Sequence, residues 1–92
     1  MEFEWDQTKG VSNLRKHGIG FEDATSIFGD PLAFTFRDPD HSVGEARFLT
    51  FGVTRTGELL VISHASRNNR TRLISARRAT GAERKIYEEG QV

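Results

Sequence analysis

Two turn signals divide the second half of the chain into three runs that are typical of β-strands. The signals are Thr56-Gly57 and Asn68-Asn69, because Gly and Asn tolerate the positive φ that short hairpin loops demand. The runs around them are rich in β-branched and apolar side chains and cover residues 47–54, 59–66 and 71–76. The pattern predicts a three-stranded antiparallel meander, with residues 32–37 as a fourth strand.

Helix signals lie on both sides of this sheet. Asp6 is a good N-cap for a first helix that runs to residue 16 or 17 and stops at Gly18. Thr80 and Glu83 have the spacing of a capping box, which predicts a short C-terminal helix. A second N-terminal helix is indicated by side chains that share one helical face and by the Gly and Pro that end it: Phe21, Ala24, Thr25, Phe28, Gly29 and Pro31.

These elements predict one α+β domain over residues 1–92. Two N-terminal helices pack, mainly on one face, against a four-stranded antiparallel sheet, and a short C-terminal helix follows. Residues 3–5 alternate apolar and polar side chains, which is enough for a fifth, edge strand. A chain of 92 residues without cysteine has room for one modest core, without disulfides or thiolate metal ligands.

The formal net charge is zero, but the charges are divided unevenly along the chain. Residues 1–46 hold four Lys or Arg against nine Asp or Glu, and residues 47–92 hold nine against four. Six arginines and one lysine lie between residues 59 and 85, against the single acid Glu83. A guanidinium group binds phosphate oxygens in pairs, so this distribution favours a polyanionic partner. The alternative is that the arginines form ion pairs with the acidic N-terminal half.

The predicted turns also assign side chains to the two faces of the sheet. If both turns contain two residues, His64 lies between Leu49 and Leu73 on the apolar face that packs on the helices. A histidine is the side chain that titrates nearest neutral pH, so His64 is a candidate acid–base catalyst. A half-buried structural histidine is an equally good interpretation.

The opposite, open face carries Phe48, Ala65 and Arg72 in one row under the same assumption. Its other basic residues are Arg67, Arg70 and Arg78. This face is mixed, small and basic, and so suits an extended polyanion.

A metal site and a membrane segment are not expected. Asp38, Asp40 and His41 share a loop, but their spacing matches no EF-hand and no His-x-x-x-His pair. A proline-containing turn is the better interpretation, and we assign no metal and no cofactor. No apolar run approaches membrane-spanning length, and the acidic N-terminus lacks the layout of a signal peptide, which predicts a cytoplasmic protein.

Three groups of motifs resemble the BrnT family of type II toxins. They are Phe-Glu-Trp-Asp (residues 3–6) with Asn-x-x-Lys-His-Gly (13–18), Phe-Glu-Asp-Ala (21–24), and Arg-x-Ile-Ser-Ala-Arg-Arg-Ala (72–79) with Glu83 and Tyr87. The resemblance covers nearly the whole chain. Each motif is weak alone, but their order and spacing are specific.

The resemblance implies a RelE-like fold and a ribonuclease that arrests translation. It also implies a cognate antitoxin with a ribbon-helix-helix DNA-binding part, so that operator DNA is bound only through the complex. RelE-like toxins use scattered Arg, Lys and Tyr residues rather than a fixed His/Glu pair. The alternative is a non-enzymatic nucleic-acid-binding or partner-binding module that uses the same basic face.

The basic face and the resemblance together nominate site residues. The catalytic candidates are Arg72, Arg67, His64, Arg77 and Tyr87, and the substrate-binding candidates are Arg70, Arg78 and Lys85. In metal-independent RNA cleavage, arginine stabilises the charge of the phosphorane. The proton of the 2′-hydroxyl must pass to a base, for which His64, Glu83 and Tyr87 are the available types.

Overall fold

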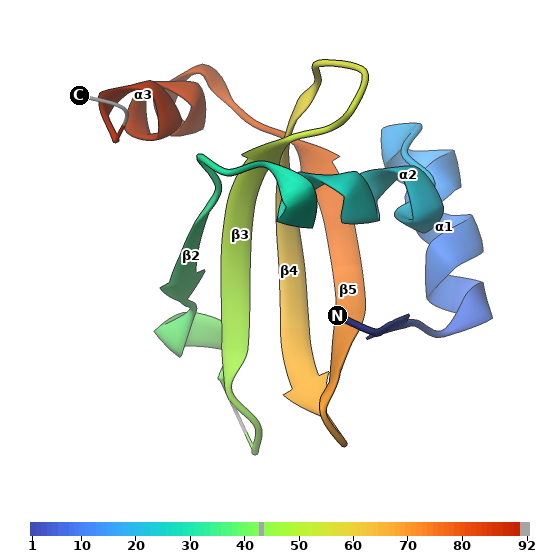
Figure 1. Cartoon of the computed structure of the whole chain (residues 1–92). Coiled ribbons are helices and arrows are strands. Elements are labelled where there is room, and N and C mark those ends of the chain that lie inside the picture. The colour runs from blue at the N-terminus through green and yellow to red at the C-terminus, as the bar shows by residue number, and fades with distance from the viewer. Residues whose placement is uncertain (43, 91–92) are drawn as a thin grey trace.

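The meander predicted from the turn signals is the centre of the fold (Figure 1). In the computed structural model, which describes residues 1–42 and 44–90, β3 (Arg47–Val53), β4 (Leu59–Arg67) and β5 (Arg70–Arg78) pair antiparallel. The fourth predicted strand, β2 (Phe34–Arg37), pairs antiparallel with β3. These four strands therefore confirm the antiparallel part of the prediction.

The edge strand β1 (Phe3–Glu4) changes the class of the sheet. It pairs parallel with β5, so the sheet is mixed and has five strands in the order β1-β5-β4-β3-β2. The prediction of a wholly antiparallel sheet was wrong on this point. No tight hairpin joins β1 to its neighbour in the sheet, so nothing local imposes the antiparallel direction.

The first helix, α1 (Gln7–His17), has the predicted bounds. The Asp6 side chain accepts hydrogen bonds from two backbone N–H groups of the first turn, and Gly18 ends the helix at φ 71°. The helix lies along the edge of β5 rather than over the sheet (Figure 1). There the Asn13 side chain donates to the carbonyl of Ala76 over 2.8 Å and accepts from its N–H over 2.9 Å. Asn13 therefore provides hydrogen-bond partners for backbone groups of β5 at residue 76, beyond the part of β5 that pairs with β1.

The second predicted helix is only one α-helical turn, α2 (Phe21–Ala24), which continues as the 3₁₀ segment η1 (Thr25–Gly29). The hydroxyls of Thr25 and Ser26 donate to carbonyls three residues earlier, which suits the tighter winding. The description of two helices packed on the sheet is therefore corrected: α2 and η1 cross one face, and α1 lies at the edge.

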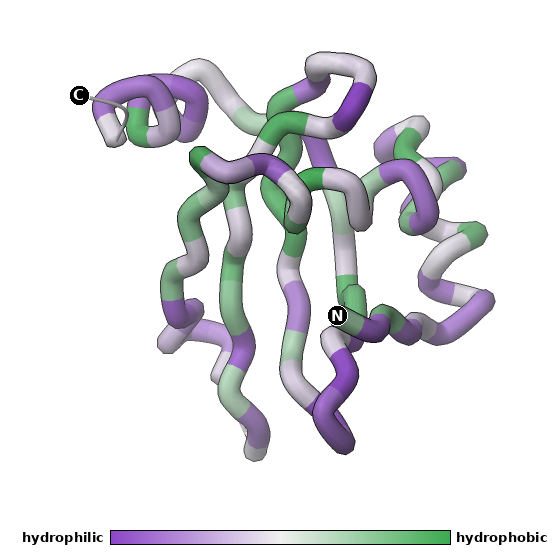
Figure 2. Tube along the Cα trace, viewed as in Figure 1, coloured by the Kyte–Doolittle hydropathy of each residue, from purple (hydrophilic) through white to green (hydrophobic). Residues whose placement is uncertain are grey.

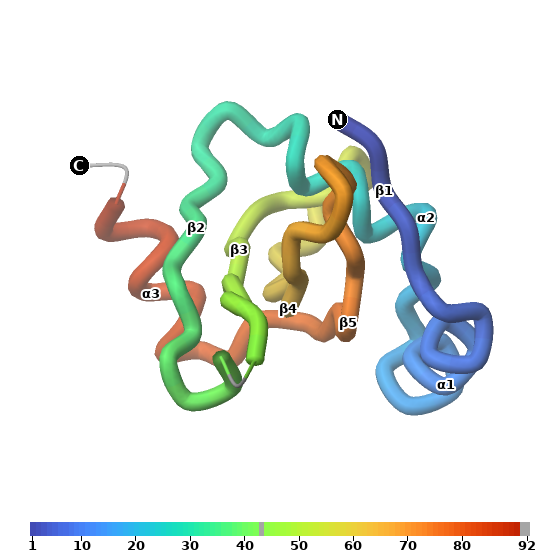
Figure 3. Tube along the Cα trace, turned by 90° about the horizontal axis from the view of Figure 1, so that it is seen from below, coloured from blue at the N-terminus to red at the C-terminus, as the bar shows by residue number. Residues whose placement is uncertain are grey.

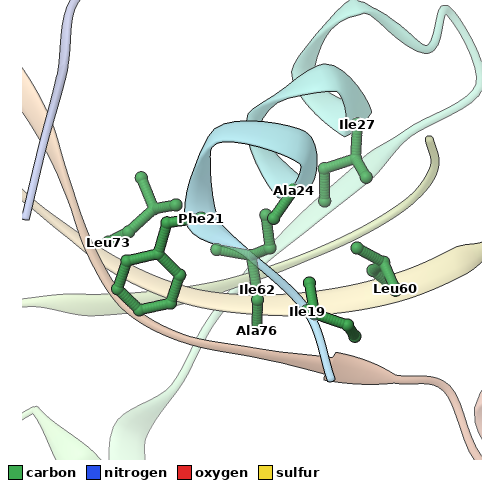
Figure 4. Packing of buried hydrophobic residues seen from close by; sticks show 8 residues of the cluster. All are labelled: Ile19, Phe21, Ala24, Ile27, Leu60, Ile62, Leu73 and Ala76. Carbon is green, nitrogen blue, oxygen red and sulfur yellow. The ribbon is translucent and has the colours of Figure 1, made fainter. Parts of the chain in front are cut away.

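Apolar side chains below α2 and η1 form the main core, which Figure 4 shows from close by. The cluster consists of Ile19, Phe21, Ala24, Ile27, Leu60, Ile62, Leu73 and Ala76. A second cluster lies on the other face of the sheet, where α3 (Gly81–Glu89) packs through Tyr87 against Phe51, Leu59 and Val61. Figure 3 shows α2 on one side of the sheet, while the chain after β5 crosses the other side to reach α3. Helices therefore cover both faces, although one face was expected.

The turn between β3 and β4 shifts the pairing of these strands by one residue from the predicted register. Thr54 N–H donates to Glu58 O and Gly57 N–H donates to Thr54 O, so the loop has three residues, with Gly57 at φ 91°. A two-residue turn had been predicted. Leu49 pairs with Ser63 instead of His64, and every β3 side chain changes face.

The second turn has the predicted form, with positive φ at both Asn68 and Asn69. Ala65 pairs with Arg72 and His64 with Leu73, as expected. Beyond them, Ser63 pairs with Ser75, so Ile74 is the extra residue of a β-bulge. The bulge moves Arg78, which was predicted on the open face, to the helix side of the sheet, and it places Arg77 on the opposite side.

The remaining short element is the 3₁₀ turn η2 (Pro39–His41), in the loop where a proline-containing turn was expected. His41 Nδ1 lies 2.8 Å from the carboxylate of Asp38. Within residues 1–42 and 44–90, no group of three or more His, Cys, Asp or Glu could hold a metal ion. In the same residues, no helix is long and apolar enough to cross a membrane.

Candidate functional site

On the sheet face opposite α2 and η1, α3 covers only one end of the strands. The end toward the β4–β5 turn is left uncovered. We call this region the open face. It is formed by Phe36, Arg47, Leu49, Ser63, Ala65, Arg67, Arg70, Arg72, Ser75 and Arg77, which the strand pairings place on one side of the sheet. The most hydrophilic part of the sheet is the adjoining turn at its lower end (Figure 2).

Three arginines of the open face share one neighbourhood, which we call the arginine cluster: Arg47, Arg67 and Arg72. Arg47 and Arg72 both pair with Ala65, one from each side. Arg67 donates two hydrogen bonds to Glu45, over 2.9 and 3.2 Å. The bond from Arg67 lowers the pKa of Glu45, and the charges of Arg47 and Arg72 lower it further. The Glu45 carboxylate therefore interacts electrostatically with all three guanidinium groups.

A second carboxylate enters the cluster from β1. Glu4 is the partner of Arg72 in the parallel pairing of β1 with β5, and Arg72 Nη1 donates to Glu4 Oε2 over 2.8 Å. Both side chains are 25% exposed. Arg47 forms no ion pair with any residue that the structure describes. With three arginines and two glutamates, the cluster keeps a net positive charge.

Ion pairing with the acidic N-terminal half was the alternative interpretation of the basic stretch, and it holds for Arg67, Arg70 and Arg72, whereas two further arginines pair with acids of the second half. The pairs outside the cluster are Arg70–Glu2, Arg77–Glu83 and Arg78–Glu58. Glu2, Glu4 and Glu45 come from the acidic N-terminal half. Partly exposed pairs of this kind contribute only about 0–1 kcal/mol, so an incoming phosphate can replace the carboxylate at low cost.

Arg77 and Arg78 changed places through the β-bulge. Arg77 lies on the open face, where it donates to both oxygens of Glu83 over 2.6 and 2.8 Å. Arg78 lies on the helix side, where it donates to Glu58 and to the carbonyl of His17 over 2.8 Å each. The assignment of Arg78 to the open face was therefore wrong, and its contacts hold the end of α1 to the sheet.

His64 lies on the helix side of the sheet, away from the arginine cluster. It is 8% exposed, and its Nε2 lies 2.7 Å from the hydroxyl of Thr50. Its ring contacts those of Phe28 and Phe48, with centroids 5.2 and 5.8 Å away. Burial lowers the pKa of His64 to about 4, so the ring is neutral near neutral pH. The placement on the core face confirms the prediction, with Phe48 instead of Leu49 beside it.

Two other candidate bases are engaged elsewhere. The bond from Arg77 lowers the pKa of Glu83 to about 2, and Glu83 also completes the capping box with Thr80. Burial, together with a 2.7 Å hydrogen bond that Tyr87 donates to Asp30, raises the pKa of Tyr87 to about 12. These contacts fasten α3 to the sheet.

The structure thus brings Arg67, Arg70 and Arg72 to one side of the sheet, where Arg70 pairs with Arg67 at the start of β5, and separates them from His64 and Tyr87. Lys85 is exposed on α3, toward the opposite end of the sheet from the β4–β5 turn (Figure 1). The sequence interpretation missed Glu4, Glu45 and Arg47. No sequence pattern singles them out, since each is one charged residue in a strand or loop outside the basic stretch of residues 59–85.

Comparisons with known proteins give one family match and one similar solved structure. The family model described as the ribonuclease toxin BrnT of a type II toxin-antitoxin system matches residues 5–83. Among solved structures, the chain is similar to the Brucella abortus ribonuclease toxin BrnT, with 22% sequence identity and a TM-score of 0.69. That alignment covers 87% of this chain and 97% of the Brucella chain. The comparison with curated proteins found no match.

Proposed function

Because this chain belongs to the BrnT family of ribonuclease toxins of type II toxin-antitoxin systems, we propose that it cleaves RNA at the arginine cluster and thereby inhibits translation. The observation that carries the proposal is the position of Arg47, Arg67 and Arg72. They lie close together on the part of this face that α3 leaves uncovered, and their charge exceeds that of the two carboxylates among them.

Phosphate binding would begin with an exchange of partners. A phosphodiester offers the same two-oxygen geometry that Glu45 presents to Arg67 and can replace a carboxylate of the cluster. Arg47 has no partner of its own among the described residues and so can bind a phosphate directly. Arg70, which pairs with Arg67 at the start of β5, extends the positive surface along the RNA backbone.

Arg72 would then stabilise the transition state. Attack of the 2′-oxygen on phosphorus gives a phosphorane with additional negative charge, and a guanidinium already held in place stabilises this charge without reorganisation. The bond from phosphorus to the 5′-oxygen breaks, this oxygen takes a proton from solvent, and a 2′,3′-cyclic phosphate remains. Because arginine supplies the charge stabilisation, this mechanism needs no metal ion.

Glu4 is the base that the geometry favours for the 2′-hydroxyl proton. Its carboxylate lies 2.8 Å from the guanidinium of Arg72, so it would remain beside a phosphate that Arg72 binds. His64, Glu83 and Tyr87 are each held by other partners. Arg77, which was nominated as catalytic, fits better as the residue that fixes α3 through Glu83.

The family also implies a partner protein. A type II system pairs the toxin with a protein antitoxin, and we propose that this antitoxin carries a ribbon-helix-helix part and that operator DNA is bound only through the complex. We propose the cytoplasm as the place of action, where the RNA substrate is found. A non-enzymatic nucleic-acid-binding module is the second candidate, since the same cluster would bind phosphates without cleaving them.

One experiment separates the two candidates. The purified chain is incubated with end-labelled RNA in the presence of excess EDTA, and the products are mapped. We expect fragments with 2′,3′-cyclic phosphate and 5′-hydroxyl ends from the wild type and almost none from Arg72→Ala. Binding of RNA without cleavage would favour the non-enzymatic module, and cleavage that EDTA abolishes would contradict metal independence.

A further inference from the structure

Phe36 is an exposed aromatic side chain on the open face, and neither core cluster includes it. It is 45% exposed, and it lies on β2, at the edge of the sheet. Its ring is held by two others: the centroids of Phe34 and Phe51 lie 5.9 and 5.5 Å away. A phenylalanine that is fixed on two sides and open on another loses little further side-chain freedom when a flat ligand packs against it.

The strand pairings place Phe36 beside the arginine cluster. Phe36 pairs with Leu49 on β3, and Arg47 lies two residues from Leu49 on the same face. Such diagonal neighbours in a sheet are about 7–8 Å apart, within the reach of long side chains. An apolar ring therefore stands next to an arginine that has no ion-pair partner in the described part of the chain.

The remainder of this row carries mostly short side chains. Across the sheet, Leu49 pairs with Ser63, and Ser63 pairs with Ser75. The two serines are short and only half-buried, and they separate Phe36 from the β5 edge. A ligand that lies along this row meets the aromatic ring, Leu49 and the two short serines, and the guanidinium groups of Arg47 and Arg72 belong to the adjoining row.

We infer that Phe36 stacks on an unpaired nucleobase of the RNA whose neighbouring phosphate binds Arg47. Aromatic rings and arginines are the groups that proteins use to hold splayed bases and backbone in single-stranded RNA. The bases of a duplex are already stacked on each other, so the site selects single-stranded RNA. This inference rests on the proposed function and specifies its substrate.

The test uses a short single-stranded oligoribonucleotide with 2′-O-methyl riboses, which binds but cannot be cleaved. Stacking of one base on an aromatic ring corresponds to an affinity change of about 5-fold to about 100-fold. We expect Phe36→Ala and Phe36→Leu to weaken binding within this range and Phe36→Trp to retain it. Val11→Ala, which shortens an exposed apolar side chain of α1, is the matched control and should bind like the wild type.

An abasic scan identifies the contact itself. When the stacked base is removed, wild type and Phe36→Ala should bind equally, and at other positions their difference should persist. Equal binding of the intact oligonucleotide by wild type and Phe36→Ala would overturn the inference and leave the proposed function standing. Failure of the wild type to bind any RNA would overturn both. Phe36→Leu keeps an apolar contact with Phe51 and should therefore stay folded. A melting temperature near that of the wild type would show that its weaker binding is not caused by unfolding.

Discussion

The guanidinium of Arg72 and the carboxylate of Glu4 lie 2.8 Å apart, although the two residues come from opposite ends of the chain. The parallel pairing of β1 with β5 places them side by side. In the proposed mechanism, Arg72 stabilises the negative charge of the transition state and Glu4 accepts the proton, so this contact joins the two proposed roles.

Arg72→Ala should reduce kcat by about 100-fold or more with RNA affinity nearly unchanged, because the lost interaction forms mainly in the transition state. Arg70→Ala is the matched control on the same strand. It should leave turnover unchanged and reduce the slope of log affinity against log salt by about 0.7, as expected for one lost contact with single-stranded RNA. Full cleavage by Arg72→Ala, with its fold intact by circular dichroism, would contradict the catalytic assignment.

Glu4→Gln should reduce kcat by about 100-fold while RNA binds as tightly as before or more tightly. The amide of the glutamine cannot accept the 2′-hydroxyl proton. Because the amide is neutral, it also no longer competes with the phosphate for Arg72. Single-turnover cleavage and equilibrium binding measure the two effects separately. Faster cleavage by this variant would show that Glu4 only neutralises Arg72.

His64→Gln should retain RNA cleavage at pH 7, because His64 lies on the helix side of the sheet. It should also change how stability depends on pH. The folded-state pKa of about 4 is depressed from 6.5, so the unfolded chain binds the proton first and wild-type stability falls as pH decreases from 6.5 toward 4. Between pH 7 and pH 5 this loss is about 2 kcal/mol for the wild type.

Urea unfolding of wild type and His64→Gln at the two pH values measures this difference. The glutamine can still bond with Thr50, so it preserves the local hydrogen bond. A variant whose stability falls as steeply as that of the wild type would show that His64 is not the group responsible. A variant that folds normally but has lost cleavage would show that His64 takes part in catalysis.

Tyr87→Phe should reduce stability by about 1–2 kcal/mol, because it removes a hydrogen bond to the carboxylate of Asp30. Burial also opposes ionisation of Asp30, but bonds from Tyr87 and from the backbone of Val53 and Leu32 outweigh it and lower the pKa of Asp30. The ring itself stays in the core beneath α3. Cleavage per folded molecule should be unchanged, and a loss of kcat without a loss of stability would assign Tyr87 to catalysis.

Local signals in the sequence were sufficient for most of the strands and helix ends and for part of the site, including Arg67 and Arg72. Asp6 and Gly18 bounded α1, Thr80 and Glu83 capped α3, and Asn68-Asn69 fixed the pairing of Ala65 with Arg72. Each of these depends on contacts within a few residues, which is why a sequence pattern can report it. The motif resemblance likewise identified the family that the comparison later matched.

Only the tertiary structure decided which charged groups meet. One additional residue in the loop 55–57 and one bulge at Ile74 moved side chains between faces, because the side-chain period of a strand is two. The parallel strand β1 then brought Glu4 to Arg72, a contact that no pattern in either segment specifies. The sequence by itself determined that the chain would present arginines on a small α+β fold. The long-range pairings determined which of them form a cluster, and which carboxylates lie among them.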